Sequence, residues 1–109
     1  MAESETIHKV TDDNFDEAVK TGVSLVDFYA DWCAPCRMLT PVIESVSKEM
    51  QGMVKFLKLD IDSNQKTATN YQVTSVPTLI LFKDGKEINR LVGLRDEGAV
   101  KQFISPALQ

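Results

Sequence analysis

Both cysteines of the chain lie in one short segment, residues 32–36, with the sequence Trp-Cys-Ala-Pro-Cys. An apolar run typical of a buried strand, Leu25 to Ala30, precedes this segment, and apolar residues at helical spacing follow it. Three-residue spacing on a helix puts Cβ atoms roughly 5–6 Å apart, and a disulfide needs Cα atoms roughly 4.4–6.8 Å apart. The chain is therefore expected to form a strand–helix junction where a disulfide opens and closes with little backbone movement.

The composition is typical of one globular domain, which we expect to span residues 1–109. The net charge of −4 and the lack of a Lys/Arg block argue against nucleic acid or an anionic membrane as a partner. The acidic, polar start of the chain does not resemble a secretory signal. We therefore expect a cytoplasmic protein, in whose reducing compartment a disulfide is more often transient and catalytic than structural.

The hydrophobic pattern predicts alternating strands and helices followed by a hairpin. Strands are expected at residues 7–10, 23–30, 54–60, 78–82 and 88–92. Helices are expected after an N-cap at Thr11, after Cys33, after Ser63 or Asn64, and around residues 100–104, ending near Pro106. Asp84-Gly85 predicts a tight turn between the last two strands. An α/β fold with a mixed sheet and helices on both faces follows.

The cysteines are predicted to lie at the carboxyl end of a central strand, with Cys33 as the N-cap of the next helix. Pro35 has no N–H to donate and presets φ for the first helical turn. The N–H of Cys36 is then the expected donor to the Cys33 sulfur, and the helix N-terminus favours a thiolate there. We expect this geometry to activate and expose only the first sulfur, which makes Cys33 the nucleophile and Cys36 the resolving thiol.

The cysteines have two alternative interpretations. A structural disulfide would close a very small loop and would constrain the unfolded chain little. A zinc site needs about four ligands, and two cysteines with a distant His8 do not supply them, so we expect no metal within one chain. A metal or cluster shared by two chains stays open as a less favoured alternative.

Asp27 and Lys58 are charged residues within apolar strand patterns. Asp27 is either a solvated carboxylate near a strand end or a buried proton acceptor beneath the helix that carries Cys36, with a pKa raised by burial. Lys58 either extends to solvent or meets Asp27. The residues alone leave both alternatives open.

Three further features of the sequence have an ordinary interpretation: Trp32, the Val76–Pro77 bond and Gly93. Trp32 is a core residue or, because it lies in a loop directly before Cys33, an exposed contact for partner proteins. The Val76–Pro77 bond is trans in most such pairs. Gly93 follows the last strand and needs to be no more than a turn residue.

The sequence resembles the thioredoxin family over nearly its whole length. Residues 27–37, Asp-Phe-Tyr-Ala-Asp-Trp-Cys-Ala-Pro-Cys-Arg, are similar to the active-site segment of that family, and residues 74–78, Thr-Ser-Val-Pro-Thr, are similar to its cis-proline loop. Pro41 falls where the family kinks its long helix, and Gly93 matches its substrate-groove glycine. Ala34 departs from the pattern, because the family usually has Gly there.

The resemblance implies a thioredoxin fold, in which a mixed five-stranded sheet is flanked by four helices. It implies a general protein-disulfide reductase, a monomer with no bound cofactor, recharged by thioredoxin reductase with electrons from NADPH. Asp27 and Lys58 become the buried pair near the resolving thiol, and Pro77 becomes cis. The implied substrate-binding residues are Trp32, Ala34, Pro35, Val76, Pro77 and Gly93. A redox-gated binding or regulatory module on the same fold is the alternative function.

Overall fold

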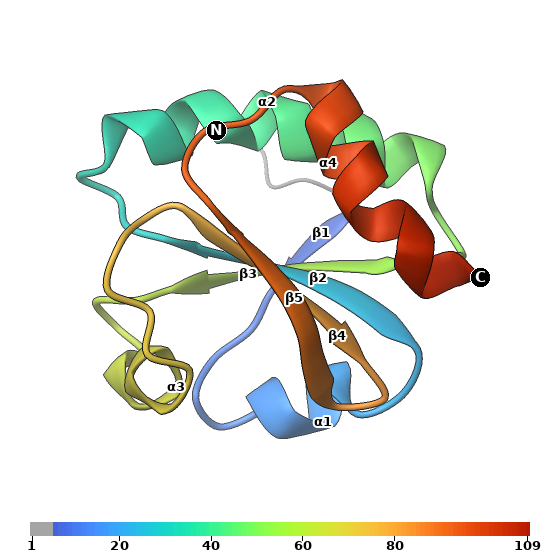
Figure 1. The fold of residues 1–109 in the computed structure, drawn as a ribbon. Coiled ribbons are helices and arrows are strands. Elements are labelled where there is room, and N and C mark those ends of the chain that lie inside the picture. The colour runs from blue at the N-terminus through green and yellow to red at the C-terminus, as the bar shows by residue number, and fades with distance from the viewer. Residues whose placement is uncertain (1–5) are drawn as a thin grey trace.

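The computed structural model describes residues 6–109 and contains a five-stranded sheet with helices on both faces (Figure 1). The strands are β1 (Ile7–Lys9), β2 (Val23–Tyr29), β3 (Lys55–Asp60), β4 (Thr78–Lys83) and β5 (Lys86–Val92). The helices are α1 (Phe15–Val19), α2 (Ala34–Glu49), α3 (Gln65–Asn70) and α4 (Glu97–Ile104), and a 3-10 helix, η1 (Ser105–Leu108), follows α4.

The strand order is β1-β3-β2-β4-β5, so β2 lies at the centre of the sheet. The first three strands pair in parallel, β1 with β3 and β3 with β2. The antiparallel pairs are β2 with β4 and β4 with β5. This mixed sheet confirms the predicted architecture, and the cysteine segment begins where the central strand ends.

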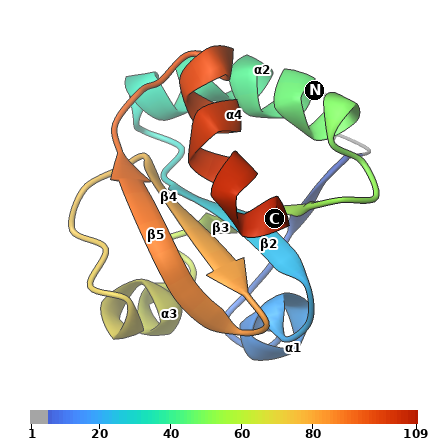
Figure 2. The same ribbon diagram turned by 45° about the vertical axis from the view of Figure 1, so that its right-hand side comes forward.

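Helices α2 and α4 cover one face of the sheet, and α1 and α3 cover the other (Figures 1 and 2). Each face of the sheet has its own cluster of buried apolar side chains. On the face covered by α2 and α4, Leu25 of β2 packs with Leu39 and Ile43 of α2. On the other face, Phe28 of β2 packs with Phe15 of α1. Because side chains alternate along a strand, β2 directs Leu25 and Asp27 toward α2. The strand pattern thus turns a carboxyl group toward the helix that carries the second cysteine.

Of the turn and cap predictions made from the sequence, the hairpin turn is correct and the first helix cap is not. Asp84 and Gly85 have φ of 50° and 86°, which confirms the tight turn predicted between β4 and β5. The predicted cap at Thr11 is wrong, since α1 begins at Phe15 after an N-cap at Asn14. The Asn14 side-chain oxygen accepts the N–H of Thr11 at 2.8 Å, so residues 11–14 form a turn instead of the first turn of a helix.

Asn64 occupies the N-cap position of α3 but does not cap that helix with its side chain. Its Oδ1 accepts the N–H of Asp12 at 2.9 Å, and its Nδ2 donates to the Asp60 carbonyl at 3.1 Å. Asp12 in turn accepts the N–H of Thr67 at 2.8 Å, in the first turn of α3. The loop before α1 therefore supplies the carboxylate that satisfies the start of α3.

Candidate active site

The two cysteines lie at the junction between β2 and α2. Cys33 is the N-cap of α2, and the N–H of Cys36 donates to the Cys33 sulfur at 3.1 Å, as predicted. The two residues form a disulfide with their Cα atoms 5.2 Å apart. In the reduced protein, this N–H and the positive end of the helix dipole favour negative charge on the Cys33 sulfur.

Burial does not distinguish the two cysteines, because Cys33 is 4% exposed and Cys36 is 3% exposed. As whole residues both cysteines are buried, so the structure does not show the exposed first cysteine that was expected. Ala30 lies in the same small buried cluster, and the half-buried side chains of Ile61 and Val76 pack against it. The two sulfurs differ instead in what surrounds them.

The proline loop lies beside Cys33. Its sulfur is 3.7 Å from the carbonyl oxygen of Val76, which leaves an S–H donor within reach of that oxygen in the reduced form. The Val76–Pro77 bond is cis, as the family resemblance implied. Gly93 donates its N–H to the Pro77 carbonyl at 2.8 Å, so the end of β5 is fastened to the same loop. Gly93 has a φ of 98°, a conformation that side chains rarely adopt.

Trp32 is 68% exposed, which settles its placement in favour of the surface. Its indole Nε1 donates to the Asp62 carboxylate at 2.9 Å. Ala34 and Pro35 are also exposed at the start of α2. Sequence analysis missed Asp62, although one signal was present. Asp62 follows β3 as Trp32 follows β2, and the carboxyl ends of neighbouring parallel strands meet at one edge of a sheet.

Asp27 is 6% exposed and faces a cavity of about 310 Å³ that Cys36 and Lys58 also line. No group among residues 6–109 hydrogen-bonds to its Oδ1. Burial raises the pKa of Asp27 to about 7, and the nearby Lys58 ammonium group opposes that rise. The predicted burial of Asp27 beneath α2 is therefore confirmed, and Lys58, its register partner on β3, shares the cavity with it.

The remaining polar lining of this cavity was not predicted. Lys9 of β1, Asp31 after β2, and Arg37 and Thr40 of α2 all contribute to it. Arg37 Nη1 donates to the backbone carbonyl of Asp31 at 2.7 Å. These residues are far apart in sequence or carry no chemical motif, so only the fold brings them to Asp27.

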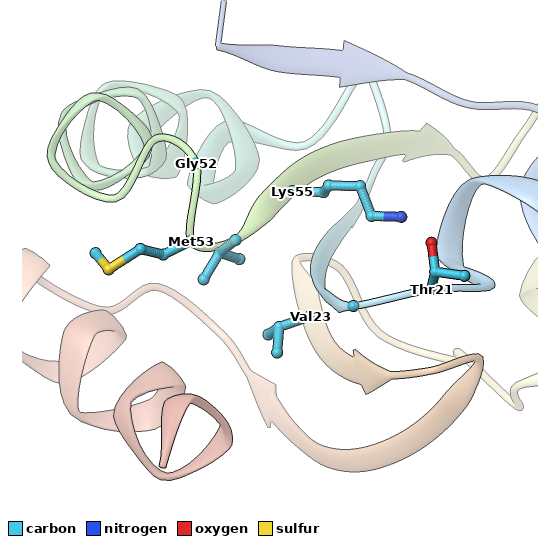
Figure 3. A pocket seen from close by; sticks show the side chains of 7 residues that line it. Thr21, Val23, Gly52, Met53 and Lys55 are labelled. Atoms are coloured by element: carbon cyan, nitrogen blue, oxygen red, sulfur yellow. The ribbon is translucent and has the colours of Figure 1, made fainter.

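A second hollow, of about 480 Å³, lies between residues 21–23 and 52–55, near the start of β2 (Figure 3). It contains none of the predicted site residues, and its ammonium group, Lys55 Nζ, donates to the Ala18 carbonyl at 2.7 Å. Within residues 6–109, no cluster of three or more His, Cys, Asp or Glu residues can hold a metal ion. His8 is exposed on β1. In the same part of the chain, no helix has the length and apolar character needed to cross a bilayer.

A cysteine pair at a helix N-terminus, with a proline loop on one side and a buried carboxyl group on the other, defines a site for thiol–disulfide exchange. Comparison with known proteins supports this assignment of the site. The family model named thioredoxin matches residues 6–106. The chain belongs to the thioredoxin family and is a disulfide-reducing thiol–disulfide oxidoreductase.

Individual relatives match over almost their whole length. A thioredoxin of Staphylococcus aureus strain Mu50 is 51% identical over 102 residues, covering 94% of this chain and 98% of the relative. A thioredoxin of Chlamydia trachomatis is 48% identical over 99 residues, covering 91% and 96% respectively. Among solved structures, a mutant thioredoxin from Halobacterium salinarum NRC-1 matches with a TM-score of 0.87 and 40% identity, covering 100% of this chain and 96% of that one.

Proposed function

We propose that residues 1–109 form a single thioredoxin domain that acts in the cytoplasm as a monomeric, general reductase of protein disulfides. The observation that carries this proposal is that two cysteines of nearly equal burial have different surroundings. Cys33 accepts a backbone N–H at the start of α2, and Cys36 borders the cavity of Asp27. The Cys33 sulfur is thereby suited to attack a substrate disulfide, and the Cys36 sulfur is suited to resolve the mixed disulfide.

In the first step, the thiolate of Cys33 attacks one sulfur of a substrate disulfide. A mixed disulfide forms between Cys33 and the substrate, and the other substrate sulfur leaves as a thiolate that takes up a proton. The N–H of Cys36, 3.1 Å from the Cys33 sulfur, supports the attacking charge before the bond forms. Cys33 is the nucleophile in this proposal.

In the second step, Cys36 resolves the mixed disulfide. Its thiol gives its proton to the Asp27 carboxylate, and the resulting thiolate attacks the Cys33 sulfur. The bond between Cys33 and the substrate breaks, and the second substrate sulfur leaves as a thiolate that takes up a proton. A carboxyl group with a pKa of about 7 is suited to this transfer, because it is partly ionised near neutral pH. Lys58 modulates Asp27 by favouring its charged form.

The substrate chain binds beside Cys33 in an extended conformation. Among residues 6–109, no backbone group hydrogen-bonds to the N–H or the carbonyl of Val76. The N–H and the second lone pair of the carbonyl oxygen, which the Cys33 sulfur approaches at 3.7 Å, are therefore the groups proposed to bond a substrate backbone. Around this point Trp32, Ala34 and Pro35 are exposed, Val76 and Gly93 are half-buried, and Pro77 is buried. The residues assigned to substrate contact are Trp32, Ala34, Pro35, Val76, Pro77 and Gly93.

After each turnover the enzyme holds the Cys33–Cys36 disulfide and needs two electrons. We assign thioredoxin reductase as the partner that supplies them from NADPH, with no cofactor bound to this chain. The test is insulin-disulfide reduction with thioredoxin reductase and NADPH. We expect NADPH oxidation that depends on this chain, and none with Cys33→Ser. Binding of partners in one redox state without turnover would instead favour a redox-gated binding module.

A further inference from the structure

Three charged side chains form a row across the sheet beside Cys36. Lys9 of β1 is in register with Lys58 of β3, and Lys58 is in register with Asp27 of β2. Register partners on neighbouring strands project from the same face of a sheet. All three residues, together with Cys36, line the same cavity. Lys58 therefore stands between Lys9 and the buried carboxyl group.

Two lysines side by side repel each other. Neighbouring strands are about 4.8 Å apart, and like charges placed directly opposite are destabilising. The ammonium group of Lys58 lies on the β2 side, 6.0 Å from the centroid of the Tyr29 ring. Its position is the one that repulsion from Lys9, on the opposite side of β3, favours.

The other charged groups around Asp27 come from the segment that follows β2 and from α2. The Arg37 guanidinium is tied to the backbone carbonyl of Asp31, and the Asp31 carboxylate lies at the same cavity. These two groups carry opposite charges, so their effects on Asp27 partly cancel. Lys9 and Lys58 are the remaining charged side chains that line the cavity.

We propose that Lys9 is a positioning residue for thiol–disulfide exchange, whose positive charge holds the Lys58 ammonium group toward Asp27. This inference rests on the proposed role of Asp27 as the proton acceptor of Cys36. Without the charge of Lys9, the Lys58 side chain is free to extend toward β1 and solvent. Asp27 then loses part of the positive charge that favours its ionised form.

Distance decides whether Lys9 acts directly or through Lys58. Lys9 and Asp27 are two strands apart, which is about 10 Å. That separation equals about one Debye length at 0.1 M ionic strength, so salt weakens the direct attraction between the exposed Lys9 and Asp27. Lys58 is half the distance away and faces the cavity. We therefore expect most of the effect of Lys9 to pass through the position of Lys58, and the Lys58→Gln background measures the direct part.

The experiment follows the carboxyl carbon of Asp27 by NMR during a pH titration of the full chain. Lys9→Gln is expected to raise the titration midpoint by roughly 0.2–0.7 pH unit, the range of an exposed charge pair. Lys9→Arg should keep the wild-type midpoint. Lys86→Gln, on the exposed edge strand β5, makes the same change in net charge and should leave it unmoved. In a Lys58→Gln background, Lys9→Gln should have little further effect.

A Lys9→Gln shift no larger than that of Lys86→Gln would overturn the proposal, as would an undiminished shift in the Lys58→Gln background. At pH 4, where the folded Asp27 keeps its proton and a change in its pKa leaves stability unchanged, Lys9→Gln should unfold at the same or a higher denaturant concentration, because it removes a repulsion. Loss of a structural contact would lower that concentration. The pH profile of insulin reduction should move with the Asp27 midpoint. If the midpoint moves and the profile does not, Lys9 still positions Lys58, and Asp27 is not the proton acceptor.

Discussion

At the scale of single residues, the two cysteines differ in chemistry although they are equally buried. Cys33 has a backbone donor at 3.1 Å, and the Val76 carbonyl is 3.7 Å from its sulfur. Cys36 borders the cavity that contains Asp27. In the proposed mechanism, the groups that surround each sulfur, and not the accessibility of the resting disulfide, therefore set the order of attack.

We predict that Cys33→Ser abolishes disulfide reduction and that Cys36→Ser traps the substrate. In Cys36→Ser, the Cys33 thiolate still attacks, but no second thiol is present to displace the product. Mass spectrometry after incubation with a disulfide substrate should detect a covalent adduct at Cys33 in that variant. Cys33→Ser, the matched control, should give no adduct. An adduct through Cys36 in the control would reverse the two roles.

At the scale of elements, the sequence correctly predicted caps and turns that form between residues close together in the chain. The cap at Cys33 and the Asp84-Gly85 turn are formed by residues adjacent in sequence, and both predictions are confirmed. The start of α1 was mispredicted because two cap-type residues compete there, and the Asn14 side chain bonds the Thr11 N–H instead of the helix. Residue propensities do not show which backbone N–H group a cap-type side chain will bond.

Contacts between elements account for the parts of the site that were missed. The bond from Trp32 to Asp62 spans 30 positions of the chain, and Lys9 meets Lys58 only because β1 pairs with β3. A residue's own neighbours in sequence do not specify such contacts. Asp27 could be singled out from the sequence, because a carboxylate inside an apolar strand is unusual whatever its partners are.

We predict that α4 depends on its cap at Asp96. The Oδ1 of Asp96 accepts the N–H of Ala99 at 2.9 Å, and α4 buries Val100 and Ile104 against the sheet. Asp96→Ala should lower the free energy of unfolding by about 1 kcal/mol. Asp96→Asn, the control, keeps the acceptor and should retain most of that stability. Equal denaturant midpoints for wild type and Asp96→Ala would contradict this assignment.

At the scale of the whole molecule, one carboxyl group near the centre of the sheet opposes folding. Asp27 is buried, none of residues 6–109 hydrogen-bonds to its Oδ1, and its pKa is raised from 3.8 to about 7. Asp12 behaves in the opposite way, because its hydrogen bond to the Thr67 side chain, above all, lowers its pKa. The two effects occupy different pH ranges. Asp12 stabilises the fold above pH 3.8 and loses that effect as pH falls below it, whereas Asp27 acts between pH 3.8 and about 7.

We predict that stability falls as pH rises from about 4 to about 7, because of Asp27. In this window the folded protein keeps the Asp27 proton and the unfolded chain releases it, so rising pH favours unfolding. A shift of about 3 units corresponds to a loss on the order of 4 kcal/mol. Asp27→Leu, which has no proton to lose, should be more stable than wild type at pH 7.

Denaturant unfolding at pH 4 and pH 7 tests this prediction for wild type, Asp27→Leu and Asp27→Asn. Asn matches Asp in size and does not titrate, so Asp27→Asn should lose the same pH dependence as Asp27→Leu, whatever its own stability. Both variants should also reduce insulin more slowly at pH 7, because Cys36 loses its proton acceptor. If Asp27→Asn keeps the wild-type fall in stability between pH 4 and pH 7, another group causes that fall. If both variants turn over at the wild-type rate, Asp27 is a cost to folding without a role in the reaction.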